Sequence, residues 1–299
     1  MNGPPRATGP IRKAVCLFAL FAADGRLSHS VLHYLGALRA CDLSVHVALS
    51  GMTGPHPQDR ERLDRLGIVA HPRPNEGLDF GAWQFLLRTG CAKDADLIVL
   101  ANDSVFGPVR DLRPILRDML SRDLDIWGMV ESHEVAWHLQ SWFIAMRAET
   151  LQRPAIMRVL ELPFASMSKA EIVLHGEIGL GCAIRAEGLS WAACLPDERR
   201  GLRRLIATNP MHLDWLHVLR SGRVPFIKVE LLRDNPMRIP WQPSWPRALR
   251  RYGSFPRDWI TERITPSRGV RASLKMRLLY LALTRSRLAA LRTLFGREG

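Results

Sequence analysis

The chain contains no apolar segment that is long enough to cross a lipid bilayer. The run 14–23 is too short, and no other run reaches the roughly 18 apolar residues that a spanning helix needs. The segment 1–13 contains Pro4, Pro5 and Pro10 and lacks the apolar core of a secretion signal. We therefore expect a cytoplasmic protein with a disordered tail at 1–13.

Cysteine spacings typical of metal sites or redox motifs are also missing. There is no CxxC pair and no Cys/His cluster with zinc spacing. The five cysteines are far apart: Cys16, Cys41, Cys91, Cys182 and Cys194. This distribution predicts buried free thiols in a reducing compartment.

Acidic side chains are scarce relative to basic ones. The chain has 29 Asp and Glu against 42 Lys and Arg, which leaves a formal net charge of +13. Such a charge indicates an anionic partner: nucleic acid, an anionic membrane face or a phosphate-bearing substrate. The basic residues are scattered or gathered near the C-terminus, and no nucleic-acid-binding motif is present. We therefore expect no nucleic-acid partner.

The first hundred residues alternate between strand-like and helix-like patterns. Apolar segments typical of strands are 14–21, 43–50, 68–71 and 96–101. Helical patterns fill the intervals at 28–39, 59–66 and 80–88. The alternation predicts an α/β fold whose mostly parallel sheet has helices on both faces. Ligands bind such sheets beyond the carboxyl ends of the strands, so the loops 75–81 and 102–108 are candidate binding sites.

The second half of the chain is less regular. We expect strands at 125–131, 138–147, 191–195 and 225–232, of which the first two could pair as a long hairpin. Helices are expected at 149–160, 168–186 and 209–220. The pattern changes near residue 237, so we divide the chain into a catalytic domain, 14–236, and an extension, 237–299. We predict that the Pro- and Trp-rich part of the extension, 237–256, is an extended surface wrap.

Asp103 is the first candidate functional residue. It follows a predicted central strand and stands between Asn102 and Ser104. A carboxylate in this position could hold Mg²⁺ or Mn²⁺, which would bridge two phosphates and neutralise the charge of a leaving diphosphate. The alternative is an aspartate that caps a strand-to-helix turn.

The segment 73–83 offers a second candidate site. Gly77 and Gly81 allow a ligand to approach the backbone closely, and the helix start nearby suits an anion. Asp79 could cap that helix, or it could join Asn75 in binding a base or ribose.

Two further segments could act on a sugar acceptor. If 138–143 is a strand, His138, Gln140 and Trp142 share one face, which resembles a sugar-binding surface. A carboxylate is also needed to take the proton of the attacking hydroxyl. Glu177, in a Gly-rich stretch, is one candidate for this base, and Glu131, at a strand end, is the other.

Six segments together, in this order, resemble the rhamnan synthesis F family. They are RPNEGLDFGAW (73–83), LANDSVFGP (100–108), WGMVES (127–132), HLQSWF (138–143), GEIGLG (176–181) and PFIKVELLRDNP (225–236). The resemblance implies a GT-A-like, Rossmann-related glycosyltransferase of rhamnose-rich polysaccharide or lipopolysaccharide synthesis. It suggests a rhamnosyltransferase whose donor is dTDP-rhamnose or a UDP- or GDP-sugar, with a glycan or lipid-linked acceptor.

The layout is also similar to the inverting family-two glycosyltransferases. Asn102-Asp103-Ser104 stands where those enzymes have the metal-binding DxD motif, with one carboxylate instead of two. Gly176-Glu177 stands where they have a Glu-Asp pair, which favours Glu177 over Glu131 as base. The incomplete DxD leaves an alternative open, an inactive scaffold that recruits an assembly complex to the membrane. The family-like Arg233, Asp234 and Asn235 receive no role.

From Arg271 onward the composition is that of a basic amphipathic helix. Apolar residues such as Met276, Leu279 and Leu283 share one arc, and basic residues such as Lys275 lie mostly opposite. Such a helix could lie on the anionic inner face of the cytoplasmic membrane. It could equally pack on the catalytic domain or form a dimer contact.

Overall fold

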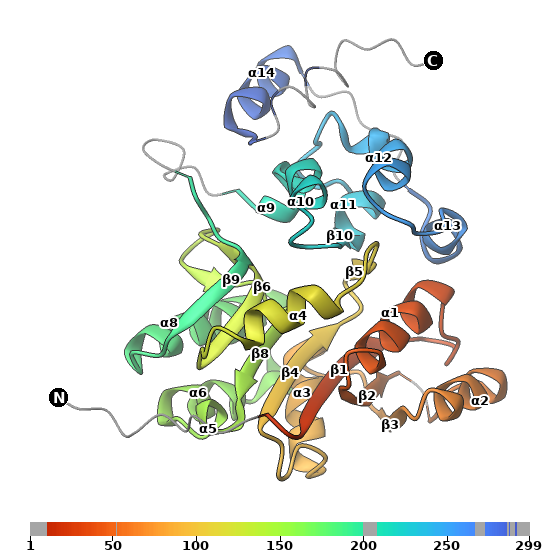
Figure 1. Cartoon of the computed structure of the whole chain (residues 1–299), viewed down its shortest axis with the longest axis vertical. Helices are drawn as coiled ribbons and strands as arrows, with labels where there is room; N and C mark the ends of the chain where they lie inside the picture. The colour runs from red at the N-terminus through yellow and green to blue at the C-terminus, as the bar shows by residue number, and fades with distance from the viewer. Residues whose placement is uncertain are drawn as a thin grey trace.

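The computed structural model describes residues 11–51, 53–199, 208–266, 273–285, 287 and 291 (Figure 1). Residues 1–10 of the predicted tail and most of 284–299 lie outside this part. Among the described helices, none is long and apolar enough to span a bilayer.

One mixed sheet organises the chain. Its strands follow the order β3-β2-β1-β4-β8-β6-β7, and β9 pairs with β6. The strands on the main path are β1 (Ala14–Phe21), β2 (Ser44–Ser50), β3 (Val69–Arg73), β4 (Leu97–Asn102), β6 (Ile126–Ser132), β7 (His138–Leu139) and β8 (Phe143–Arg147). The first four are mutually parallel, β8 is antiparallel to β4 and β6, and β9 (Trp191–Leu195) is parallel to β6. The predicted mostly parallel sheet is therefore confirmed.

Helices cover both faces of this sheet because its strands are apolar on both sides. On β1, Cys16, Phe18 and Leu20 join one core cluster, whereas the alternate residues Val15 and Leu17 join the other. The first cluster packs against α1 (His29–Arg39), α2 (Pro57–Arg65) and α4 (Arg113–Leu120). The second packs against α3 (Leu78–Arg88), α6 (Pro154–Leu160) and α8 (Gly179–Ala186).

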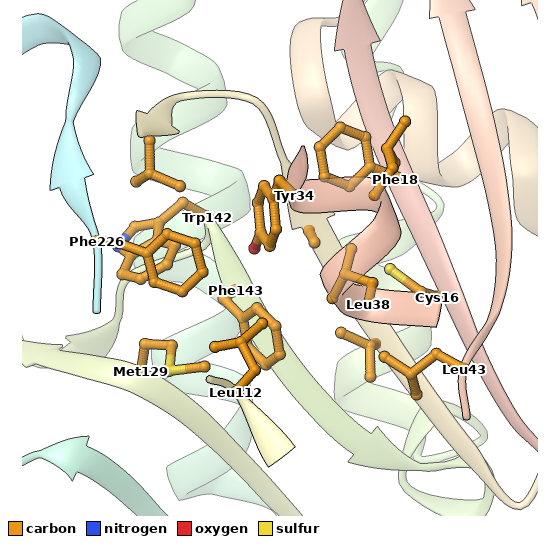
Figure 2. Packing of buried hydrophobic residues seen from close by; sticks show 14 of the residues in the cluster. Cys16, Phe18, Tyr34, Leu38, Leu43, Leu112, Met129, Trp142, Phe143 and Phe226 are labelled. Atoms are coloured by element: carbon orange, nitrogen blue, oxygen red, sulfur yellow. The ribbon is translucent and has the colours of Figure 1, made fainter. Parts of the chain in front are cut away.

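Phe226 connects the first cluster to the far end of the chain. Figure 2 shows it against Tyr34 and Trp142, and its ring centroid lies 4.9 Å and 5.2 Å from theirs. The next residues form β10 (Ile227–Lys228), which pairs with β5 (Val105–Phe106). This packing fixes the segment that carries Lys228 beside the end of β4. The cysteines are free, but only Cys16 and Cys194 are buried and Cys182 is exposed, unlike the prediction.

Several predicted elements differ from the observed ones. The strand 138–147 is interrupted at 140–142, where the main-chain N–H of Ser141 donates to the Glu177 carboxylate. The helix 149–160 is split into α5 (Ala148–Leu151) and α6, which begins at Pro154 because proline suits only the first helical turn. The prediction of a strand at 225–232 was wrong beyond Lys228, because the next residues form a helix, α11 (Val229–Arg233).

The helix predicted at 168–186 is confirmed, with an unusual centre. It runs through α7 (Lys169–Glu171), a π-helical segment (Ile172–Ile178) and α8. The π-helical segment carries Glu177 toward the end of β4. Wider π-helical turns occur frequently at functional sites.

The segment 237–256 is not the predicted extended wrap. Ile239, Trp241 and Trp245 are buried in a third core cluster, so the tryptophans hold this segment in helical structure. The helices of this region are α9 (Pro210–Leu213), α10 (Trp215–Ser221), α12 (Trp245–Tyr252), α13 (Asp258–Arg263) and α14 (Leu274–Leu283). In Figure 1 they gather beyond β5 and β10, with α13 close to α1.

Candidate functional site

A cavity of about 980 Å³ opens at the carboxyl ends of β1 and β4. Its wall includes the loop 22–28, the start of α3, Asn102 to Ser104, the π-helical segment and the beginning of α11. Residues 263–265 complete it from the C-terminal region. The cavity therefore lies where an α/β sheet is expected to bind its ligand.

Asn102 organises the floor of the cavity. It is buried at the end of β4, and its side-chain amide donates to Asp79 Oδ2 at 2.5 Å. Its Oδ1 accepts from the Ser104 amide at 3.0 Å and from the Ser104 hydroxyl at 2.6 Å. One buried amide thus fixes both the carboxylate that follows β3 and the hydroxyl that follows β4.

Asp79 does not cap α3. The N-cap is Gly77, whose φ of +68° suits glycine, and a Cβ there would lie 2.8 Å from Phe164. Burial raises the pKa of Asp79, as does the nearby charge of Asp103, whereas Lys228 and the Asn102 hydrogen bond lower it, and the result is about 7. A carboxylate with this pKa exchanges a proton near neutral pH.

Asp103 is engaged by a cation from the C-terminal region. Arg263, the last residue of α13, forms an ion pair with its carboxylate and donates to its main-chain carbonyl at 2.6 Å. Burial raises the pKa of Asp103, and the charge of Arg263 opposes that rise. Asp103 therefore forms a tertiary ion pair, not a helix cap.

These residues fit a bound divalent cation poorly. The Asp103 carboxylate already faces a guanidinium, and Asn102 Oδ1 is occupied by Ser104. Mg²⁺ demands near-octahedral oxygen coordination. In the described part of the chain, no three His, Cys, Asp or Glu side chains converge where they could hold a metal ion.

Lys228 is a cavity residue to which the sequence assigned no role. Its Nζ lies 3.3 Å from Ser104 Oγ and 6.0 Å from the centroid of the Trp142 ring. Burial lowers the pKa of Lys228, whereas the carboxylates of Glu177 and Asp79 raise it. The only sequence signal was its place in the family-like string 225–236.

Of the two candidate bases, Glu177 lies in the cavity wall and Glu131 does not. Glu177 accepts the Ser141 N–H at 2.6 Å, which fixes its orientation. Glu131 is buried elsewhere and accepts from Trp137 Nε1 and from the Asp197 amide, each at 2.8 Å. Its hydrogen bonds tie β6 to the chain after β9.

The predicted acceptor residues lie behind the cavity, not in it. His138, Gln140 and Trp142 are buried, and none of the three lines the cavity. Gln140 accepts from Trp142 Nε1 at 2.9 Å and donates to Asn209 Oδ1 at 3.0 Å. Asn75 is exposed outside the cavity, and Gly77 shapes the start of α3.

A family model matches more than half of the chain. The model of the family described as rhamnan synthesis protein F matches residues 55–266. The chain belongs to this family. A curated relative is virulence protein VirA of Vibrio anguillarum (strain ATCC 68554 / 775), 24% identical over 198 residues. The match covers 56% of this chain and 63% of VirA, so the chain spans less than two thirds of its relative's length.

Solved structures with partial similarity include two transferases. Mouse xyloside xylosyltransferase 1 in its apo form is 9% identical, with a TM-score of 0.35, over 62% of this chain and 85% of that one. The glycosyltransferase GlyE of Streptococcus pneumoniae TIGR4 is 11% identical, with a TM-score of 0.36, over 60% and 45%. HddC of Yersinia pseudotuberculosis is 10% identical, with a TM-score of 0.33, over 60% and 89%.

Proposed function

We propose that the protein is a glycosyltransferase that moves a sugar from a nucleotide-sugar donor to a cell-surface glycan. The observation that carries the proposal is the convergence of Asp79, Ser104, Glu177 and Lys228 on one cavity at the strand ends. Its volume of about 980 Å³ falls at the upper end of the range of small-molecule sites, about 300–1,000 Å³. Membership of the rhamnan synthesis protein F family supports rhamnose as the sugar and polysaccharide or lipopolysaccharide as the product.

The donor nucleotide would occupy the side of the cavity formed by β1 and α3. Phe21, at the end of β1, is 54% exposed and lines the cavity, so its ring could stack on a nucleobase. Asp79 and Ser104 line the same cavity and offer polar contacts for ribose and phosphate. dTDP-rhamnose and UDP- or GDP-sugars are the donors to test.

Transfer with inversion requires a base for the acceptor hydroxyl, and we assign that role to Glu177. The hydroxyl oxygen attacks the anomeric carbon as its proton passes to Glu177, and the bond to the diphosphate breaks. The hydrogen bond from Ser141 holds the carboxylate in one orientation for this transfer. No step is assigned to a divalent cation, because the Asp103 site fits one poorly.

Glu177→Gln tests the enzyme. We expect the wild type to release nucleoside diphosphate from one sugar donor in the presence of acceptor, and the variant to be slower by about 100-fold or more. Glutamine keeps an oxygen to accept the Ser141 N–H, so the fold should persist. Glu161→Gln, a change at an exposed position after α6, should leave the rate unchanged. Equal rates for Glu177→Gln and wild type would reject this base, and nucleotide binding without any turnover would support the inactive scaffold.

We also propose that α14 binds the membrane surface. Tyr280 and Leu283 of this helix are buried in the third cluster, and Tyr280 donates to the Met237 carbonyl at 2.6 Å. Leu274, Leu278 and Leu279 are exposed. This exposed surface, in which Lys275 lies among the leucines, could rest on an anionic leaflet and bring the enzyme to a lipid-linked acceptor.

A further inference from the structure

Among the described residues, only Ser104 accepts a hydrogen bond from the ammonium group of Lys228, which is half-buried in the cavity. Its hydrogen bond to Ser104 Oγ, at 3.3 Å, uses one of three donors. Across the part of the chain that the structure describes, no carboxylate forms an ion pair with it. The carboxylates of Glu177 and Asp79 line the same cavity but form no ion pair with it in the described chain, so the ammonium group keeps two N–H donors for an anionic ligand.

The position of Lys228 is fixed from both sides. β10 pairs with β5, and Phe226 is inserted between Tyr34 and Trp142. The Trp142 ring lies beneath the ammonium group at 6.0 Å, which restricts where the side chain can move. The charge is therefore held next to Ser104, at the end of β4, before a ligand arrives.

Two carboxylates of the cavity wall already have protein partners. Asp103 forms an ion pair with Arg263, and Asp79 accepts from the Asn102 amide. A divalent cation bound there would have to displace Arg263 and would lie near Lys228, which repels it. The arrangement favours a ligand that brings negative charge over a metal that brings positive charge.

We propose that Lys228, and not a divalent cation at Asp103, supplies the positive charge that binds and stabilises the donor diphosphate. This inference rests on the proposed function. When the sugar–oxygen bond breaks, its electron pair remains on the diphosphate, whose growing charge faces the ammonium group, and the acceptor proton goes to Glu177. Ser104 Oγ, whose proton goes to Asn102 Oδ1, accepts from Nζ at 3.3 Å and so holds the ammonium group at the end of β4.

Calorimetric titration of the full chain with UDP, GDP, dTDP and inorganic pyrophosphate, first in EDTA and then with Mn²⁺, tests this inference. We expect the wild type to bind at least one nucleotide in EDTA. Lys228→Met should weaken that binding by about 10- to 100-fold, and Lys228→Arg, which keeps the charge, should retain most of it. Lys93→Met, at an exposed position away from the cavity, is the matched control and should bind like wild type.

The outcomes separate this inference from the proposed function. Binding by the wild type only with Mn²⁺ overturns the role of Lys228 and leaves a nucleotide-dependent enzyme. Binding of Lys228→Met equal to wild type in EDTA overturns it as well. If no nucleotide and no pyrophosphate bind under either condition, the proposed function fails and the inference fails with it. Melting curves check that each variant folds, and Lys228→Gln is a second neutral variant if Lys228→Met does not.

Discussion

Arg263 donates to both the carboxylate and the main-chain carbonyl of Asp103, a residue 160 positions earlier in the sequence. The two side chains are only 20% and 15% exposed. The ion pair connects the end of α13 to the end of β4 and closes one wall of the cavity. The wall of the site therefore includes residues beyond 236, where the family-like strings end.

Breaking this pair should leave a mostly buried carboxylate without a counter-charge. We expect Arg263→Met to lower the free energy of unfolding by about 1–3 kcal/mol, between the values for surface and buried pairs. The double variant Arg263→Met/Asp103→Asn should recover part of that loss, because it removes the unpaired charge. Urea denaturation of the two single variants and the double variant measures the coupling. Additive effects would mean that the pair contributes nothing, and Arg250→Met is the exposed control.

Asp79 should make stability fall as pH rises toward neutrality. Its folded-state pKa, about 7, lies above its ordinary value of 3.8 because of burial. The folded protein therefore keeps a proton that the unfolded chain releases between about pH 4 and pH 7, so the stabilising effect present at acid pH is lost across that window. Asp79→Asn removes this dependence and should be more stable than wild type at pH 8, by about 4 kcal/mol, with little difference at pH 4. A variant less stable than wild type at pH 8 would contradict this result.

The parallel half of the sheet could be predicted from sequence because its signals are local. The strands at 14–21 and 96–101 are continuous apolar runs, and each is observed within one residue of its predicted bounds. The break at 140–142 could not be predicted, because the Ser141 N–H within it donates to Glu177, a carboxylate 36 residues away. The two-residue strands β5 and β10 are too short to show a period, and each exists only because the other pairs with it.

The residues of the candidate site also form two groups, those that the sequence reveals and those that it does not. Asp79, Asp103 and Glu177 were found because strand ends and glycine-rich turns are visible in the sequence. Lys228 and Arg263 were missed, since each reaches the cavity from a segment more than a hundred residues from its partner at the end of β4. The trio of His138, Gln140 and Trp142 was placed on one face of a strand that the chain does not form there.

A buried charge network ties the chain after β9 to the segment after α14, and it should control acid stability. The side chain of Asp197 is 2% exposed and pairs with Arg199 at 2.7 Å and Arg285 at 2.8 Å. Burial raises the pKa of Asp197, but hydrogen bonds and charge from Arg199, then the charge of Arg285, outweigh it and lower the pKa to about 2. This folded pKa lies below the ordinary value, so the stability is present above about pH 4 and is lost as the pH falls toward 2.

Asp197→Asn tests that network. We expect a loss of about 2–4 kcal/mol in the free energy of unfolding at pH 7, because two arginines lose their shared carboxylate. The difference from wild type should shrink at pH 2–3, where Asp197 itself becomes protonated. Urea denaturation at both pH values measures this, and Asp118→Asn, whose exposed carboxylate pairs with Arg122, should cost less than about 1 kcal/mol. A loss at pH 7 no larger than that of the control would reject the network.

If α14 binds an anionic membrane, that binding should depend on both the charge and the exposed apolar surface of the helix. Leu278 is 57% exposed on this helix and Lys275 precedes it by one turn. We expect the wild type to sediment with vesicles that contain phosphatidylglycerol but not with pure phosphatidylcholine vesicles. Reversing one charge removes about 1 kcal/mol for the lost lysine and adds repulsion, so Lys275→Glu should weaken binding about 10-fold.

Leu278→Asp should weaken vesicle binding further, since it places a carboxylate on the face that would enter the lipid headgroups. Val135→Asp is the matched control, because Val135 is 75% exposed at a site remote in sequence from α14. Equal sedimentation of Leu278→Asp and Val135→Asp would show that general surface charge, and not α14, determines the interaction. If wild type and both α14 variants stay in the supernatant with anionic vesicles, the membrane role of α14 is rejected.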